Sequence, residues 1–365
     1  MPIPIIIGLG VAAAAAIGAK KGYDGYKKQS ESNEIVDDSR ARYDVRREQF
    51  ERQEKKTLAA LDSLGQLELN IGKEFERFST LSAALLQQLN QSRDIKLEVK
   101  LPRHTLQKVE AYTYSAVSVL GSVAGASASG VAAGFAVYGG VMSFAAASTG
   151  TAISSLAGAA ATNATLAAIG GGSLAAGGLG IAGGTAILGA AVFAPILAIA
   201  GWAYDSHASE ALRNAKDARI KVDLAIGKLE SATTSLASTE VAARQVRSAL
   251  EELRVNFDRY LDTLEGIDTF IGSVRRFGRD VDEELAKFED EIMSAIGNGY
   301  ALASILTDII STPLFKVKMK DGDVVVGPDG MPTMEVDTDG SMILNTEGVK
   351  AAVATGLNSA MRFNA

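Results

Sequence analysis

The chain contains no cysteine, and it has one tryptophan, two histidines and seven prolines in 365 residues. Without cysteine it has no disulfide, no thiol nucleophile and no cysteine-based zinc site. The two histidines, His104 and His207, are too few for a metal centre without further ligands. P-loop, nucleophile-elbow and HExxH patterns are also missing. The sequence therefore predicts no catalytic residues, no metal and no cofactor, and a protein that is not an enzyme.

Acidic residues outnumber basic ones, and aromatic residues are few. The formal net charge is −7, and aromatic residues make up 6% of the chain. Nucleic-acid-binding proteins usually carry a basic face with interleaved aromatics, which this sequence does not offer. We expect no nucleic-acid partner.

The longest absence is that of charge. Residues 111–204 contain no Lys, Arg, Asp, Glu or His and are rich in Ala and Gly. This stretch is several times longer than the roughly 20 residues that a helix needs to cross a bilayer. Glycines four residues apart allow helix backbones to approach closely, and three such pairs lie in the stretch. These predicted helix-packing glycines are Gly121, Gly125, Gly130, Gly134, Gly180 and Gly184.

Aromatic residues stand at both ends of the uncharged stretch. Tyr112 and Tyr114 lie at its entrance, and Trp202 and Tyr204 lie at its exit. Such residues favour the depth of the lipid headgroups, so they are predicted membrane-interface anchors. Basic residues flank the stretch on both sides. This favours an even number of membrane crossings, with both flanking segments in the cytoplasm. The basic residues are Arg103, Lys108, Arg213 and Lys216.

The alternative is that residues 111–204 form the tightly packed core of a soluble protein. Leu, Ile, Phe and Val favour insertion by about 0.3–0.6 kcal/mol each, but the middle of the stretch has few of them. Glycine also costs about 1 kcal/mol relative to alanine within a helix. This balance favours a segment that inserts conditionally. The apolar N-terminal helix expected over residues 1–21 has the same two interpretations, a membrane span or packing against protein.

Two charged segments flank the uncharged stretch, and both have helical periodicity. Apolar residues recur every three or four positions over residues 34–101 and again over residues 205–312. We expect these two arms to form long antiparallel amphipathic helices in a coiled-coil-like bundle around an Ala/Gly-rich helical hairpin. Gly266, Gly272 and Gly278 are predicted bends, and Gly297-Asn298-Gly299 is a predicted end of the helical series.

The tail, residues 314–365, has a different pattern. Short strand-like runs are separated by Asp321-Gly322, Asp329-Gly330 and Asp339-Gly340, and Asp-Gly is favoured in tight hairpin turns. The sequence predicts a small antiparallel β meander, followed by a helix that Thr346 and Glu347 open. So small a unit is marginal by itself, so we expect it to dock on the helices or to mediate assembly. The predicted fold class is mainly α.

The glycine-rich segment from Ser148 to Gly183 resembles the core of a widespread group of glycine-zipper-like bacterial helical proteins, most of them uncharacterised. That group also combines a short apolar N-terminus with a charged helical arm. The layout is similar, more loosely, to apolipoprotein L and to α-helical pore-forming toxins. This likeness implies arms that shield an apolar hairpin, which inserts and oligomerises when they separate.

The sequence thus leaves two hypotheses. The first is a membrane-associated, conditionally inserting or pore-forming protein of the bacterial cytoplasmic membrane, with the lipid bilayer and further copies of itself as partners. The second is a soluble coiled-coil scaffold in the cytoplasm that works through protein partners.

Overall fold

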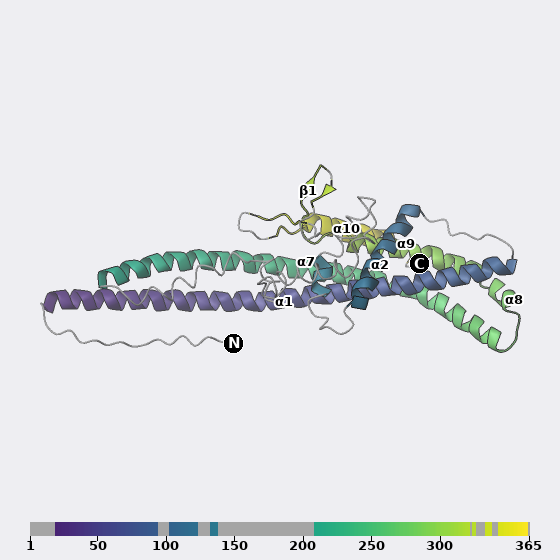
Figure 1. The fold of residues 1–365 in the computed structure, drawn as a ribbon, viewed down its shortest axis with the longest axis horizontal. Coiled ribbons are helices and arrows are strands. Elements are labelled where there is room, and N and C mark those ends of the chain that lie inside the picture. The colour runs from purple at the N-terminus through teal and green to yellow at the C-terminus, as the bar shows by residue number, and fades with distance from the viewer. Residues whose placement is uncertain are drawn as a thin grey trace. The chain divides into compact units, whose positions relative to one another are not determined.

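The computed structural model describes residues 19–93, 102–122, 132–137, 208–321, 323–325, 333–337 and 342–363. These residues are mainly α-helical, which confirms the predicted fold class. Figure 1 shows the arrangement of the elements. The α-helices are α1 (Ala19–Arg93), α2 (Arg103–Ser122), α7 (Ala208–Arg276), α8 (Val281–Ala286), α9 (Glu289–Ile310) and α10 (Thr346–Ala360). Residues 132–137 are also helical. The smaller elements are β1 (Met319–Lys320), β2 (Asp323–Val324) and a short 3₁₀ helix, η5 (Met361–Phe363).

The chain divides into two compact units. The first consists of Met1–Glu48 and Val192–Glu230. In this unit, ion pairs join α1 and α7. Residues later in α1 pair with residues later in α7. Glu31 pairs with Lys216 at 3.5 Å, Arg42 with Asp223 at 2.8 Å and Arg46 with Glu230 at 2.9 Å. The two helices of this unit therefore run parallel.

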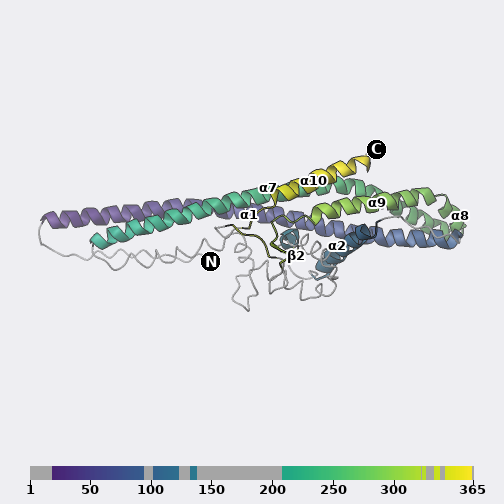
Figure 2. The same ribbon diagram turned by 90° about the horizontal axis from the view of Figure 1, so that it is seen from above.

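The second unit consists of Gln49–Ala191 and Ser231–Ala365. Here too, α1 and α7 lie side by side and parallel (Figures 1 and 2). The Thr57 hydroxyl donates to the Leu236 carbonyl oxygen at 2.9 Å. Farther along both helices, the Arg254 Nε donates to the Glu74 carboxylate, also at 2.9 Å. Arg77 and Glu265 pair at 2.6 Å beyond that.

For α1 and α7 this direction corrects the prediction of antiparallel helices, which holds within the second arm, between α7 and the later helix α9. That prediction treated the arms like neighbouring helices of a bundle, which short loops join head to tail. Here residues 94–207 stand between the end of α1 and the start of α7. So long a connection removes the constraint, and the facing side chains decide the direction. The uncharged stretch lies within this connection.

A seven-residue repeat on each helix accounts for the side-by-side packing of α1 and α7. Such a repeat keeps one seam of a helix facing its partner. Every side chain at the seam positions is at most 6% exposed. The positions on α1 are Tyr43, Phe50, Thr57, Leu64, Ile71, Phe78 and Leu85. Those on α7 are Val222, Leu229, Leu236, Ala243, Leu250, Phe257, Leu264 and Ile271.

Helix α9 adds a third layer to the core of the second unit, and it runs antiparallel to α7. Phe288, just before α9, packs edge-on against Phe270 with ring centroids 5.5 Å apart. At the other end of this contact, Phe78 touches both Phe257 and Tyr300, each at 5.2 Å. The approach is close, because a Cβ on Gly299 would meet the Phe78 ring at 2.3 Å. Consequently α9 continues through residues 297–299, and the predicted end of the helical series at this point is wrong.

The turn between α7 and α8 has the geometry of a helix C-cap. Gly278 has φ +67°. Its N–H donates to the Arg275 carbonyl at 3.2 Å, and the Arg279 N–H donates to the Val274 carbonyl at 3.1 Å. This pair of bonds is the Schellman motif, which satisfies the last carbonyls of a helix. Asp280 then caps α8 by accepting from the N–H groups of Asp282 and Glu283. The helix ends just before Gly278, where a bend is predicted, whereas Gly266 and Gly272 lie within α7, which continues to Arg276.

Alanine at these glycines is expected to have opposite effects. Gly278→Ala should lower the free energy of unfolding by about 1–2 kcal/mol, because a side chain at positive φ clashes with its own backbone. Gly266 lies inside α7 with open space around the position of a Cβ, so Gly266→Ala should raise the free energy of unfolding by up to about 1 kcal/mol. Chemical denaturation followed by circular dichroism measures both. Equal effects of the same sign would contradict this account of the turn.

The tail confirms the predicted antiparallel pairing, with an arrangement that the sequence did not reveal. Strands β1 and β2 form a hairpin whose turn residue Asp321 has φ 55°. Beside it, three N–H groups form a ring of hydrogen bonds of 2.8–2.9 Å, from Lys316 to Ile343, from Ile343 to Glu335 and from Glu335 back to Lys316. A second such ring runs through Lys318, Thr333 and Val325. The rings leave no open edge at these six residues.

Helix α10 packs the tail against α9. This agrees with the expectation that so small a unit docks on the helices. The Asn345 side chain caps α10 by accepting from the Gly348 N–H at 3.3 Å, and it donates to the Pro313 carbonyl at 3.0 Å. A Cβ on Gly356 would lie 2.6 Å from the Ile309 side chain. The tail is therefore part of the second unit's core.

Candidate functional site

The start of the uncharged stretch packs against one face of α1, in the second unit. We call this face the seat, and it consists of Gly65, Glu68, Leu69, Gly72 and Phe75. These residues recur at three- and four-residue intervals or multiples of them, which places them on one side of a helix. Helix α2 and residues 132–137 lie on the seat. The charged segment before Ala111 and the uncharged segment after it belong to the same helix, α2, so the predicted boundary at residue 111 is not a structural break.

Two glycines make the seat close-fitting. A Cβ on Gly65 would lie 1.7 Å from the Ala132 carbonyl oxygen, and a Cβ on Gly72 would lie 2.3 Å from the Ala116 Cβ. Real Cβ atoms do not approach so closely, so any larger residue must displace the segment above it. The seat thus accepts the small residues of the uncharged stretch by having no side chain of its own at two positions. This is close helix packing of the small-residue kind.

Tyr112 anchors α2 to the seat. Its side chain is fully buried, and its hydroxyl donates to the Glu68 carbonyl oxygen. The ring packs edge-on against Phe75 at 6.0 Å and tilted against Phe135 at 6.2 Å. Outside the seat, Lys108 of α2 pairs with Asp308 of α9. Both ends of this part of α2 are therefore tied to the arms.

The Glu68 carboxylate is the weak point of the seat. The residue is 3% exposed, and within the described part of the chain its Oε2 has no hydrogen-bond partner. Burial raises the pKa of Glu68 well above its ordinary value, because the charged form loses hydration without gaining a cation. Burial also raises the pKa of Tyr112 strongly, and the charges of Glu68 and Glu74 add to the effect. Burying a charge without a partner costs free energy, so the seat is not optimised for stability.

The neighbouring carboxylates are arranged differently. Glu74, two residues after Gly72, pairs with Arg254 of α7, which also lies 3.7 Å from Asp258. Burial raises the pKa of Glu74, and the hydrogen bond from Arg254 opposes that rise. A cation therefore accompanies Glu74 but not Glu68.

The predicted site residues have different positions. Among the predicted interface anchors, Tyr112 is a core residue in this structure, and Tyr114 is 53% exposed. Among the predicted packing glycines, Gly134 is buried, and Gly121 is exposed with open space around it. The remaining residues predicted for the site lie outside the described residues, so their roles stay predictions. They are Gly125, Gly130, Gly180, Gly184, Trp202 and Tyr204.

Sequence reasoning missed Gly65 and Gly72. A signal was present, because two glycines seven residues apart interrupt an otherwise strong helix former without ending it. In a charged amphipathic arm each costs about 1 kcal/mol of helix propensity, which a close contact can offset. The partner of such a contact lies more than 40 residues away in sequence, so the spacing alone does not reveal it.

Comparison of the chain with protein-family models, curated proteins and solved structures finds no match in any of the three. Among the helices that the structure describes, none combines the length and the apolar character of a membrane-crossing segment. Most of the uncharged stretch lies outside the described residues.

Proposed function

We propose that the chain is a membrane-associated protein whose uncharged stretch changes between two states. In the first state the start of the stretch rests on the seat, and in the second the stretch leaves the seat and enters the bilayer as an oligomerising helical hairpin. The bacterial cytoplasmic membrane is the proposed location, with both arms on the cytoplasmic side. The protein has no catalytic role in this proposal.

One observation carries the proposal. The uncharged segment packs against two glycines of the seat, Gly65 and Gly72, and it covers the Glu68 carboxylate, which has no cation partner among the described residues. Glycine and alanine contacts bury little apolar area, and burial contributes about 25 cal/mol per Å². The buried Glu68 carboxylate opposes packing further. Leaving the seat therefore costs mainly the contacts of two buried rings, Tyr112 and Phe135, whereas the GxxxG glycines remain able to pack in lipid.

The parallel coil favours the second candidate function, a non-inserting scaffold. In each unit the seven-residue seam gives α1 and α7 a core that needs no membrane, and the exposed faces of these helices offer surface to protein partners. In this alternative the seat is a permanent contact, and the uncharged stretch is a protein core.

The test compares a seat variant with a matched control. Gly72→Leu places a side chain where Ala116 lies, and overpacking of this kind costs about 1–3 kcal/mol. That cost shifts a two-state equilibrium about 5- to 150-fold toward the released state. Gly266→Leu puts the same side chain on an open face of α7. The measurement is flotation with liposomes, a carbonate wash and dye release.

Under the proposal, Gly72→Leu increases the carbonate-resistant fraction, and Gly266→Leu leaves it at the wild-type level. Dye release by the same variant shows a pore, and retention without dye release shows an anchored hairpin. If wild type and Gly72→Leu both stay in the soluble fraction without binding liposomes, the scaffold function replaces the proposed one.

A further inference from the structure

The turn that joins α7 to α8 presents an exposed aromatic ring. Phe277 is 78% exposed, more than any other large apolar side chain that the structure describes. It is the last residue before Gly278, so the C-cap hydrogen bonds fix its backbone. Two turns earlier, Phe270 packs against Phe288. The base of the turn is therefore anchored in the protein, whereas Phe277 is held outside it.

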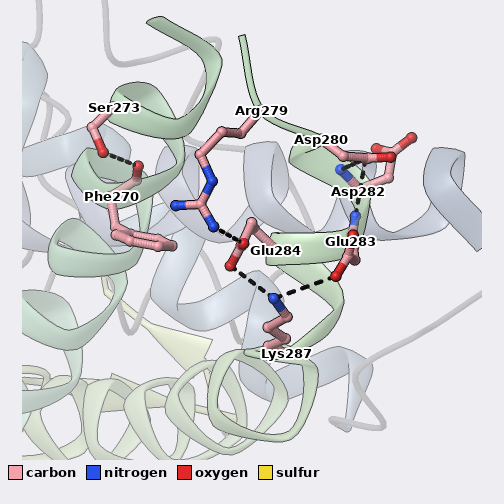
Figure 3. Close-up of polar contacts among 8 residues, drawn as sticks. All are labelled: Phe270, Ser273, Arg279, Asp280, Asp282, Glu283, Glu284 and Lys287. Carbon is pink, nitrogen blue, oxygen red and sulfur yellow. Dashed lines mark hydrogen bonds and ion pairs between the residues drawn. The ribbon is translucent and has the colours of Figure 1, made fainter. Parts of the chain in front are cut away.

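Several charged side chains near Phe277 in sequence, of both signs, form no ion pair within the described part of the chain. Arg275 and Arg276 are exposed, and neither has an ion-pair partner among the described residues. Arg279 and Lys287 are engaged, because both pair with Glu284 (Figure 3). On the acidic side, three exposed carboxylates have no ion pair in the described part of the chain. They are Asp282, Asp290 and Glu291.

The balance of charge selects between two kinds of partner. Residues 275–291 carry four basic and seven acidic side chains, a net charge of −3. An anionic lipid surface would repel this segment as a whole. A second copy of the same turn offers acids to the arginines and arginines to the acids. Contact about a two-fold axis is self-complementary in this way, because residue i meets residue j and j meets i.

We propose that the turn of residues 275–291 is a self-association surface. Phe277 of one copy packs against Phe277 of a second copy, and Arg275 and Arg276 of each copy face the unpaired acids of the other. Aromatic residues and arginine are the side chains most enriched at protein interfaces. The surface is small compared with the roughly 800 Å² per partner of a standard interface. The affinity between copies is therefore weak, and the associated fraction rises with local concentration. This inference does not depend on membrane insertion.

The absence of cysteine makes the test direct. A single cysteine at Ser273→Cys, one turn before Phe277, lets a short bismaleimide join two copies only where their turns meet. Val241→Cys, on an exposed position of α7 away from the turn, is the matched control. In the full-length chain, Ser273→Cys is expected to give the cross-linked dimer and Val241→Cys only a background amount. Adding Phe277→Ser should lower the yield about tenfold, as for loss of an anchoring aromatic.

Charge exchange decides whether the arginines and acids face each other. Arg275→Glu with Arg276→Glu should abolish the cross-link, and so should Asp290→Arg with Glu291→Arg. A mixture of these two variants should restore it as a heterodimer. Equal cross-linking from both cysteine positions, or no restoration in the mixture, would overturn the proposal. So would a loss of cross-linking accompanied by Phe277-dependent binding to anionic vesicles, which would instead assign the turn to lipid.

Discussion

Phe257→Ala is expected to lower the free energy of unfolding of the helical core by about 3–5 kcal/mol, the usual cost of removing a buried phenylalanine. Phe257 is fully buried and occupies a seam position of α7. Its ring touches Phe75 at 5.1 Å and Phe78 at 5.2 Å. Phe75 belongs to the seat, and Phe78 contacts α9 through Tyr300. One truncation therefore opens a cavity where the seam, the seat and α9 meet.

The matched control is Phe277→Ala, which removes the same side chain from an exposed position directly after the same helix. It should change the free energy of unfolding by less than about 0.5 kcal/mol. Urea denaturation of both variants, followed by circular dichroism, measures the difference. Similar losses in the two variants would mean that this aromatic cluster does not hold the helices together.

Glu68→Gln is expected to raise the free energy of unfolding at pH 8 by about 1–3 kcal/mol, because the neutral amide takes up no proton when the chain folds. The variant keeps the shape of the side chain and removes its charge. Tyr112 is the titratable group that faces Glu68 from α2, and it is neutral at this pH. Glu74, six residues farther along α1, forms an ion pair with Arg254. No described cation loses a partner in the variant.

The sign of the pH dependence follows from the raised pKa. Below the ordinary pKa of 4.5 the carboxyl is protonated in both states, and Glu68 costs nothing. As the pH rises above that value, the unfolded chain releases the proton but the folded chain retains it, so wild-type stability falls until the folded pKa is passed. Burial also raises the pKa of Glu54 and Asp258, which act in the same direction. The difference between wild type and Glu68→Gln isolates the Glu68 contribution.

Thermal unfolding of both proteins between pH 4 and pH 9 measures this difference. The melting temperatures should coincide at the acidic end and diverge as the pH rises. Divergence at the acidic end would contradict the burial of an unpaired carboxylate. Under the proposed function, alkaline rather than acidic conditions weaken the seat, so flotation of the wild type should increase with pH and that of Glu68→Gln should not.

The helical arms could be predicted because their apolar spacing is long and regular. A repeat such as that of Leu64, Ile71 and Phe78 depends only on positions along one helix, and the structure buries all three. The Asp321 turn and the helix after Asn345 could be predicted for a similar reason, since local backbone preferences and capping determine them.

The direction of the arms could not be predicted from these patterns. An apolar seam is compatible with a parallel or an antiparallel partner, and the distinction depends on which charges face each other, such as Arg42 and Asp223. Those pairs are about 180 residues apart in sequence. Gly266 and Gly272 show the same limit at short range, because tertiary packing carries α7 through both of them despite their low helix propensity.

The seat was the least predictable part. Tyr112 was assigned to a lipid interface from its place at the edge of the uncharged stretch, yet the structure gives its hydroxyl a protein acceptor. An amphipathic aromatic suits both environments, so its sequence position cannot distinguish them. The sequence pattern does not single out Glu68. Its burial depends on α2, which packs against it from the far side of Pro102.

The parallel pairing also affects how the protein is made. The hydrogen bond from Thr57 to Leu236 can form only after the ribosome has added Leu236, which is 179 residues later in the chain. At a synthesis rate of about 5–20 residues per second, this delay is about 10–35 seconds. During this time the seam of α1 is finished but has no partner, while nascent chains on neighbouring ribosomes display the same seam in the same orientation. Seven-residue repeats pair readily with copies of themselves, so translation must favour the late partner from the same chain over an early one from a neighbour.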